Sequence, residues 1–365
     1  MARSLRVVIA GGGTGGHLFP GIALAEELSR RGGEVLFVGT ARGIEARIVP
    51  ESPWELATLE VVGIKGKGML GVVGGLLRLP QAGLQSLKII RRFKPDLVVG
   101  VGGYASGPLV ASAALIGIPT VILEQNSVPG LTNRILARLV KKIFATFPDP
   151  QHYFPAKKFV QRGNPIRADL LRQLQSGESE RTGSGPRIFV FGGSQGARAL
   201  NQMLLDALPE LHEKFPNLEV LHQTGAKDLD WVQEGYVRAG LEGDRFRVMD
   251  FVRDMASAYR WCDLALCRAG ATSLSELAAV GCPAILVPFP HAADNHQEYN
   301  ARALVDAGAA RMLLESECSA QELGRELHAL LADKQARETM HHAMLRSSRP
   351  HAAVDICDEM ERLVD

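Results

Sequence analysis

Short apolar runs recur along the chain, and most are followed by glycines and then by a stretch with helical periodicity. This order is typical of an α/β protein in which the strands of a parallel sheet alternate with helices. Near the N-terminus, residues 5–10 are predicted as a strand, 11–16 as a turn and 21–31 as a helix. Because the runs are continuously apolar rather than alternating, we expect both faces of each sheet to be covered. The other predicted strands are 35–38, 97–101, 120–124, 188–191, 218–223, 263–267 and 284–288.

The two halves of the chain share a weak internal repeat. RVVIAGGGTGG, which starts at Arg6, resembles RIFVFGGSQGA, which starts at Arg187, and each is typical of a strand that enters a glycine loop and then a helix. A length of 365 residues suits two domains. We therefore predict two Rossmann-like, doubly wound parallel-sheet domains. The first should cover residues 1–162 and the second 163–345, and residues 346–365 should form a C-terminal helix that can pack back on the N-terminal domain.

Charge is nearly balanced over the chain but unevenly divided. The 41 basic and 40 acidic side chains give a formal net charge of +1, so nucleic acid is not an expected partner. Residues 1–162 nevertheless hold 20 basic and 10 acidic side chains, and none of the acidic ones lies between Glu60 and Asp96. The basic and apolar residues of 64–94 predict contact with an anionic membrane surface, although an amphipathic helix packed on the sheet would show the same pattern. They include Lys65, Lys67, Met69, Leu70, Val72, Val73, Leu76, Leu77, Arg78, Leu79, Lys88, Arg91, Arg92 and Lys94.

Other simple features limit the class of protein. The five cysteines form no C-x-x-C pair and are odd in number, so neither a zinc site nor a disulfide framework is indicated. The N-terminal apolar run is too short for a signal peptide. The uncharged stretch 97–123 is long enough to span a bilayer, but its glycines and prolines favour strand, loop, helix and strand instead. Together these features predict a location in the cytosol.

Three glycine loops lie between a predicted strand and a helix: GGGTGGH at 11–17, GGYASGP at 102–108 and GGSQGAR at 192–198. Such a loop brings backbone N–H groups and the positive end of a helix to one point, which favours a bound anion. Any one of them alone could be a tight turn, but three such loops at strand ends favour phosphate chemistry.

The first loop also satisfies G-x-G-x-x-G, the pattern of nicotinamide-dependent enzymes. That interpretation requires an acidic residue about 20 positions later to hold the ribose. The second predicted strand leads instead into VGTAR, so only an NADP-dependent oxidoreductase that uses Arg42 remains as an alternative. No P-loop motif occurs, and the single D-x-D pair, Asp228 and Asp230, is expected to cap a helix rather than hold a metal.

The most informative segment is DLALCRAGATSLSELAAVGCPAILVPFP, residues 263–290. Its small residues let a base or a phosphate approach the backbone, and Glu276 can accept hydrogen bonds from both hydroxyls of a ribose. A capping box formed by Ser273 and Glu276 is a compatible alternative. The next strand leads into a polar cluster, in which Asn295 and Gln297 can bind sugar hydroxyls or simply face solvent.

Two residues are candidate general bases. His17 lies where the first loop meets a helix, and a neutral imidazole there can accept a proton from an alcohol. A phosphate contact and a helix cap are the alternatives for His17. Glu124 ends a buried strand and is the rival base, and the neighbouring Gln125 and Asn126 suggest recognition of hydroxyl groups.

Seven segments occur in order along residues 6–300: GGGTGGHLFPGIALAEEL, GGYASGP, LEQNSVPGLTN, GNPIR, FGGSQGARALN, CRAGATSLSE and PFPHAADNHQEYNA. In order and spacing they resemble the bacterial branch of glycosyltransferase family 28 that transfers N-acetylglucosamine (GlcNAc) from UDP-GlcNAc to lipid I in peptidoglycan synthesis. The resemblance implies a GT-B fold, in which two Rossmann-like domains face a cleft and the C-terminal domain holds most of the donor.

The resemblance also implies roles for individual residues. Ser194 and its loop would contact the phosphates of UDP, the backbone of Val252 would meet the uracil, and Gln297 would contact the GlcNAc group. The nucleotide site would comprise Ala271, Thr272, Ser273, Leu274, Ser275 and Glu276. The residues near the sugar and diphosphate groups would be Thr14, Gly15, Gly16, Asn126 and Arg167. The acceptor diphosphate loops would include Gly12, Gly13, Gly102, Gly103, Tyr104 and Ser106.

The family reaction inverts the anomeric centre and forms a β-1,4 linkage to the C4 hydroxyl of N-acetylmuramic acid (MurNAc), giving lipid II. Glycine-loop amides and helix ends can stabilise the charge on the departing phosphate, so no metal or other cofactor is expected for the chemistry. The expected partners are UDP-GlcNAc, lipid I, other cell-wall synthesis proteins and the cytoplasmic face of the inner membrane, bound peripherally through residues 64–94. Rival hypotheses are another GT-B enzyme, such as a glycolipid transferase or an epimerase, and a non-catalytic nucleotide-binding or membrane scaffold protein.

Overall fold

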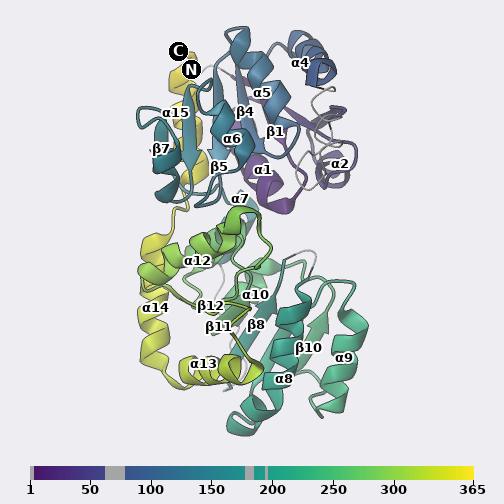
Figure 1. The fold of residues 1–365 in the computed structure, drawn as a ribbon, viewed down its shortest axis with the longest axis vertical. Coiled ribbons are helices and arrows are strands. Elements are labelled where there is room, and N and C mark those ends of the chain that lie inside the picture. Colours follow the sequence, from purple (N-terminus) through teal and green to yellow (C-terminus); the bar gives the residue numbers. More distant parts are fainter. Residues whose placement is uncertain (1–3, 62–78, 177–184, 194–195) are drawn as a thin grey trace. The chain divides into compact units, whose positions relative to one another are not determined.

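The computed structural model describes residues 4–61, 79–176, 185–193 and 196–365. The chain forms two compact units, one of Met1–Ala168 with Arg349–Asp365 and the other of Asp169–Ser348 (Figure 1). Each unit is built on one sheet of parallel strands, which confirms the prediction of two parallel-sheet domains. The boundaries fall at residues 168 and 348, where the sequence suggested 162 and 345.

The described part of the first unit contains a seven-stranded sheet in the order β3-β2-β1-β4-β5-β6-β7, and every neighbouring pair is parallel. The strands are β1 (Arg6–Gly11), β2 (Glu34–Gly39), β3 (Glu55–Thr58), β4 (Leu97–Gly102), β5 (Thr120–Glu124), β6 (Lys142–Ala145) and β7 (Phe159–Gln161). The chain adds β2 and β3 on one side of β1 and then crosses to the other side at β4. The carboxyl ends of strands at such a crossing are where doubly wound sheets bind ligands.

Helices cover both faces of this sheet. Val7 and Ile9 of β1 pack on the face covered by α1 (Gly15–Arg30) and α15 (Ala352–Val364). Val8 and Ala10 of the same strand pack on the opposite face, because successive side chains of a strand alternate. The helices of that face are α4 (Leu79–Phe93), α5 (Ser106–Leu115) and α6 (Leu131–Leu136). The short helices α2 (Glu45–Ile48), η1 (Val49–Glu51) and η2 (Asp149–Tyr153) lie in loops.

The second unit has a sheet of the same kind, with the strand order β10-β9-β8-β11-β12-β13 and parallel pairing throughout its described part. The strands are β8 (Arg187–Phe191), β9 (Glu219–Gln223), β10 (Phe246–Met249), β11 (Leu264–Cys267), β12 (Ala284–Leu286) and β13 (Ala310–Met312). The helices are α7 (Ala168–Ser176), α8 (Arg198–Lys214), α9 (Leu229–Arg238), α10 (Met255–Trp261), α11 (Ala271–Val280), α12 (His296–Asp306), α13 (Ala320–Ala332) and α14 (Lys334–Ser347), with η3 (Ala293–Asn295) before α12. The crossing point, between β8 and β11, again lies beside a glycine loop.

Each strand predicted from an apolar run is confirmed to within two residues. The stretch 97–123 is β4, α5 and the start of β5, as its glycines and prolines indicated, and no helix in the described ranges is long and apolar enough to cross a membrane. Asp228 does precede α9, but its side chain makes no capping bond. Its carboxylate instead accepts hydrogen bonds from Asn201 Nδ2 at 3.0 Å and Trp231 Nε1 at 2.9 Å.

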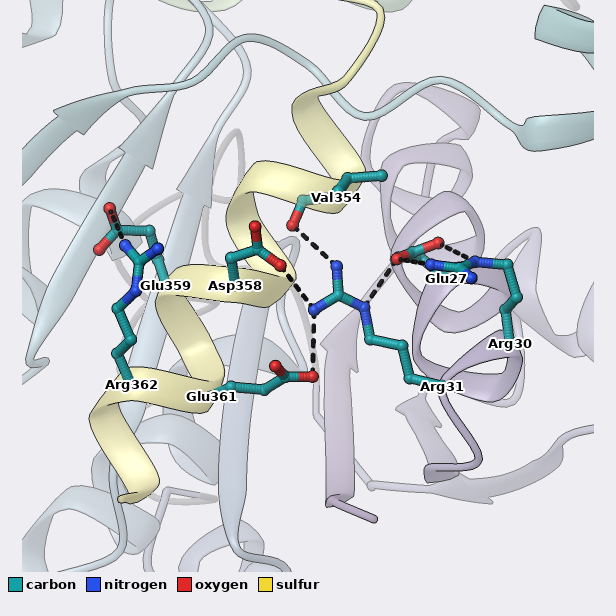
Figure 2. A network of polar contacts seen from close by, with 8 residues as sticks. All are labelled: Glu27, Arg30, Arg31, Val354, Asp358, Glu359, Glu361 and Arg362. Carbon is teal, nitrogen blue, oxygen red and sulfur yellow. Dashed lines mark hydrogen bonds and ion pairs between the residues drawn. The ribbon is translucent and has the colours of Figure 1, made fainter. Parts of the chain in front are cut away.

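The C-terminal helix α15 is part of the N-terminal unit. In this helix, the side chains of Ile356, Cys357 and Met360 are fully buried in the core of the N-terminal unit. Arg31, the residue after α1, forms polar contacts with residues of both α1 and α15 (Figure 2). The contacts of its guanidinium are Glu27 Oε1 at 2.7 Å, Asp358 Oδ1 at 2.7 Å, Glu361 Oε1 at 3.0 Å and the Val354 carbonyl at 3.2 Å. The last helix of the chain therefore completes the first domain.

We expect Arg31→Ala to lower the free energy of unfolding by about 1–3 kcal/mol, because it removes several charge-assisted hydrogen bonds at once. The Arg31 side chain is only 17% exposed, so solvent screens these bonds weakly. Arg30→Ala is the matched control: that side chain is 68% exposed and, among the described residues, pairs only with Glu27, so we expect a clearly smaller loss. Urea unfolding measures both losses, and equal values would contradict the anchoring role of Arg31.

Candidate functional site

In the first unit, the loops after β1 and β4 touch at the crossing point of the sheet. The Gly12 N–H donates a hydrogen bond to the Gly102 carbonyl at 3.2 Å. Gly11 has a φ of +139°, and a Cβ there would lie 2.0 Å from the same carbonyl. A Cβ on Gly103 would lie 2.5 Å from the Gly12 carbonyl. The glycines predicted as anion-binding loops thus also allow two backbone segments to approach each other closely.

His17 lies in the first turn of α1, against these two loops. Its Nδ1 is 3.1 Å from Oε1 of Gln125, which follows β5, and the Gln125 Nε2 donates to the Val101 carbonyl at 3.1 Å. Because the amide nitrogen of Gln125 is used in this way, its oxygen faces His17 and Nδ1 is the donor, so that in the neutral imidazole Nε2 carries the lone pair. A Cβ on Gly102 would lie 2.7 Å from the imidazole, so the ring rests on the glycine backbone.

Glu124, the rival base, lies at the end of β5 and is only 2% exposed. Its Oε1 accepts a hydrogen bond from the Asn126 N–H at 3.0 Å. Its Oε2 accepts from the Gly130 N–H at 3.2 Å and from Asn133 Nδ2 at 2.9 Å. Burial raises the pKa of Glu124 to about 7, although these donors act in the opposite direction. The carboxylate thus organises the loop that carries Asn126 and is directed into the protein.

The remaining predicted residues of the first unit differ in accessibility. Thr14 is exposed as the residue before α1, and Tyr104 is 52% exposed. The Arg167 guanidinium lies 5.2 Å above the ring of Phe19, which packs against Gly15, so Arg167 is near the start of α1. Ser106 is fully buried, because its Oγ lies against the backbone of β4, and so it does not face solvent.

In the second unit, the glycine loop after β8 is described at residues 192–193 and 196–197, so the predicted phosphate contact Ser194 lies outside the described residues. Gln223, at the end of β9, donates from Nε2 to the Gly193 carbonyl at 3.2 Å. Its Oε1 accepts the Val252 N–H at 2.9 Å. The backbone N–H of Val252 is therefore used within the protein, so a base would have to meet the carbonyl of that residue.

The predicted nucleotide segment forms the first turns of α11. The helix begins at Ala271 after Gly270, without a side-chain cap, so the capping box suggested for Ser273 and Glu276 is wrong. Instead, Glu276 accepts a hydrogen bond from the hydroxyl of the buried Tyr259 at 2.8 Å. Burial and the nearby carboxylate raise the pKa of Tyr259 well above its usual value, so the tyrosine remains a donor.

The hydroxyl and apolar residues of this segment differ in orientation. Leu274 is 2% exposed, so only its backbone can reach a ligand. The Ser275 Oγ donates to the Ala271 carbonyl at 2.9 Å. Thr272 and Ser273 are partly exposed in the first turn of the helix. A ligand at this helix end would therefore meet backbone N–H groups, two hydroxyls and the Glu276 carboxylate.

Gln297 links the ends of two strands. Its Oε1 accepts hydrogen bonds from the Ala269 N–H at 3.2 Å and the Phe289 N–H at 3.0 Å, which leaves Nε2 as a donor. Asn295, by contrast, is engaged by Glu298. Of these two candidates, the structure orients Gln297 better for contact with a sugar hydroxyl.

One residue that the sequence analysis missed is Glu45, the first residue of α2. Its carboxylate accepts hydrogen bonds from Gly13 and Thr40, at the point where an NADP-dependent enzyme would hold the ribose 2′-phosphate. A buried negative charge opposes an anion at that point, so the structure disfavours the oxidoreductase alternative. Among the described residues, no group of three or more His, Cys, Asp or Glu side chains is arranged to hold a metal ion.

Comparisons with known proteins agree along the whole chain. Residues 7–145 match the model of the glycosyltransferase family 28 N-terminal domain, and residues 187–356 match that of the C-terminal domain. A protein of Anaeromyxobacter dehalogenans strain 2CP-1 is 50% identical over 362 residues, 99% of this chain and 93% of that protein. A protein of Myxococcus xanthus is 48% identical over 97% of this chain and 92% of its own. Both are named UDP-N-acetylglucosamine–N-acetylmuramyl-(pentapeptide) pyrophosphoryl-undecaprenol N-acetylglucosamine transferase.

Solved structures give the same picture of the fold. The crystal structure of Acinetobacter baumannii MurG superposes with a TM-score of 0.79 at 30% identity, covering 98% of this chain and 99% of that chain. A putative UDP-N-acetylglucosamine 2-epimerase from Listeria monocytogenes has a TM-score of 0.71 at 14% identity over 98% of this chain and 96% of its own, which is a likeness of fold alone.

Proposed function

This chain belongs to glycosyltransferase family 28, and we propose that it transfers GlcNAc from UDP-GlcNAc to the C4 hydroxyl of MurNAc in lipid I, forming lipid II in peptidoglycan synthesis. The observation that carries this proposal is 50% identity over 99% of the chain to a transferase of that name. The two parallel-sheet domains, each with a glycine loop after its central strand, are of the GT-B type.

The C-terminal domain supplies the donor site in this proposal. The loop after β8 and the start of α11 lie at the same edge of the sheet, because β8 and β11 are neighbouring parallel strands. Backbone amides at this edge would bind the diphosphate. Glu276, oriented by Tyr259, would accept the ribose hydroxyls, and Nε2 of Gln297 would donate to the sugar.

The N-terminal domain supplies the acceptor site and the base. As the C4 oxygen attacks the anomeric carbon of GlcNAc, His17 Nε2 takes its proton, and the bond from that carbon to the β-phosphate oxygen breaks, so that UDP leaves. A single displacement of this kind inverts the anomeric centre. The hydrogen bond from Nδ1 to Gln125 supports His17 in this role, because it fixes the tautomer of the neutral ring in which Nε2 is the basic nitrogen.

We expect the transfer to continue in EDTA. Negative charge that grows on the β-phosphate would be stabilised by the loop amides after β8 and by the N-terminal ends of α8 and α11. Initial rates measured after dialysis against EDTA, with and without added Mg²⁺, check this expectation. If EDTA lowered the initial rate by more than about ten-fold and Mg²⁺ restored it, this would contradict the backbone amides as the main stabilisation of the β-phosphate charge.

We also propose that the N-terminal domain binds the cytoplasmic face of the inner membrane as a peripheral protein. Residues 64–78 of the predicted contact segment lie outside the described residues. The described helix α4 exposes Leu84 (70%) together with Lys88, Arg91 and Arg92. The segment from α6 to β6 exposes Leu131, Ile135 and Leu139, spaced four residues apart, beside Arg138. Both belong to one face of the sheet, and apolar side chains flanked by cations suit an anionic lipid surface. That other cell-wall synthesis proteins bind this chain is still a prediction from the sequence alone.

The double variant Ile135→Ser, Leu139→Ser is expected to weaken binding to anionic liposomes by about ten-fold or more, because two exposed apolar side chains no longer enter the lipid boundary. Raised salt should also weaken the binding of the wild type to these liposomes. Val237→Ser, at a side chain that is 56% exposed on α9 of the other domain, is the matched control and should change nothing. Sedimentation with liposomes measures these effects, and an unchanged double variant would count against the proposed surface.

The proposed function itself is tested by turnover with the purified chain. Incubation with UDP-GlcNAc and lipid I should give UDP and a product heavier by one GlcNAc group, detected by mass spectrometry. Two parallel incubations separate the rival enzymes: diacylglycerol replaces lipid I for a glycolipid transferase, and the acceptor is omitted for an epimerase, which would convert UDP-GlcNAc alone. Product in either of these and none with lipid I would refute the proposal.

A further inference from the structure

Glu45 is a buried acidic residue to which the proposed reaction assigns no role. It is 1% exposed and begins α2. Its Oε2 accepts a hydrogen bond from the Gly13 N–H at 2.7 Å. Its Oε1 accepts from the N–H and the Oγ1 of Thr40 at 2.8 and 2.9 Å. Within the described ranges, no lysine or arginine forms an ion pair with Glu45, so neutral donors alone compensate for its burial.

Three glycines from three different segments surround this carboxylate. A Cβ on Gly12 would lie 2.3 Å from Glu45 Oε2, one on Gly39 would lie 2.3 Å from Cγ, and one on Gly43 would lie 2.1 Å from Oε2. The loop after β1, the end of β2 and the turn before α2 can therefore close around Glu45 only because none of them has a side chain at these positions. The Glu45 side chain is therefore packed closely between the glycine loop after β1 and the end of the neighbouring strand β2.

The contact determines the position of the loop that leads into α1. Gly13 precedes Thr14, the residue before the helix, and Gly12 is bonded to the Gly102 carbonyl. The imidazole of His17 rests on Gly102. Because the Gly13 N–H already has a charged acceptor, an acceptor diphosphate on this loop would be held by amides that follow Gly13. In the second domain, the corresponding loop is held by the neutral Gln223 through a carbonyl, so the two loops are fixed in different ways.

We propose that Glu45 is a positioning residue for the transfer, which holds the first glycine loop so that its later amides and His17 face the acceptor. This inference rests on the proposed function. A carboxylate suits the role because it accepts hydrogen bonds at both ends, whereas a glutamine would turn an NH₂ group toward either Gly13 or Thr40. Removing the charge should therefore release one end of the contact without leaving a cavity.

The test compares Glu45→Gln with wild type in the lipid I assay and in calorimetric titration with UDP. We expect kcat/KM for lipid I to fall by about ten-fold or more, as for the loss of one charge-assisted hydrogen bond. The KM for UDP-GlcNAc and the Kd for UDP should stay within about two-fold, because the donor site is in the other domain. A general loosening of the protein would instead shift the UDP affinity and the acceptor kinetics together.

Thr40→Val is the milder second variant, because it removes one donor to Oε1 and keeps the Gly13 contact. We expect it to fold, to bind UDP normally and to lose roughly two- to five-fold in kcat/KM for lipid I. If Glu45→Gln does not fold, Thr40→Val tests the proposal in its place. Wild-type kinetics in the folded variants, or equal effects on UDP and on lipid I, would overturn the positioning role. Absence of turnover by the wild type would instead refute the proposed function.

Discussion

Replacing His17 with alanine is expected to lower kcat by roughly 10²- to 10⁴-fold, with a much smaller change in the KM for UDP-GlcNAc. The loss is large because His17 is the group proposed to take the acceptor proton in the transition state. The small change in KM follows because the proposed donor contacts belong to the other domain. Initial rates with lipid I and UDP-GlcNAc, over a range of each substrate, separate the two effects.

Glu124→Gln is the comparison that distinguishes the two candidate bases. Both oxygens of Glu124 accept hydrogen bonds from the loop of residues 126–130 and from Asn133, so we assign the carboxylate to holding that loop. We expect Glu124→Gln to keep kcat within about ten-fold of wild type. A loss of about a hundred-fold or more in this variant, together with a nearly active His17→Ala, would reverse the assignment.

Replacing Glu276 with alanine is the second change with a large expected effect, and it should raise the Kd for UDP by about 10- to 100-fold or more. The estimate is that for one or two charge-assisted hydrogen bonds to ribose hydroxyls, each worth about 1.5–3 kcal/mol. The carboxylate is held in place by the Tyr259 hydroxyl at 2.8 Å, so its orientation does not depend on the ligand. Isothermal titration with UDP measures the change.

2′-Deoxy-UDP makes this prediction specific to the ribose. Wild type should bind 2′-deoxy-UDP at least about ten-fold more weakly than UDP, whereas Glu276→Ala should bind the two nearly equally, because the partner of the hydroxyl is gone. Glu234→Ala removes a 70% exposed carboxylate on α9 and is the control, expected to leave both affinities unchanged. Discrimination that persists in Glu276→Ala would show that the ribose is bound elsewhere.

The strands predicted from sequence are those with a continuous apolar run, because a central parallel strand is buried on both faces. β4, for example, is buried along its whole length. The strands that were not predicted include β3, β7, β10 and β13, which lie at the edges of the two sheets. Each of them is partly exposed and short, so it lacks that signal. The remaining one, β6, is internal, but it begins with Lys142, which interrupts its apolar run and pairs with Glu359 of α15.

The glycine loops of the candidate site were predictable because clustered glycines between a strand and a helix are a local signal. The contacts that hold the loops were not. Glu45 is 32 residues from Gly13, and Gln125 is 108 residues from His17. These pairs meet only because β2, β1, β4 and β5 lie in that order in the sheet, which depends on the tertiary fold.

A signal for some of these residues was nevertheless present. Gln125 follows a buried strand and Gln223 ends one, and a polar side chain at that position must bond to a loop or to a ligand because it is buried. Gln223 bonds to the second glycine loop and to Val252. Glu45 had no comparable signal, since it lies in a short polar segment after β2 that is typical of a solvent-exposed loop.

The central claim, that the nucleotide of the donor binds in the C-terminal domain, is tested most directly by amide hydrogen exchange with and without UDP. We predict that UDP slows exchange in residues 192–197, 250–253 and 271–276. Exchange in residues 11–17 and 102–106 of the N-terminal domain should stay unchanged. Protection confined to those N-terminal loops, with none at 192–197 or 271–276, would contradict the account.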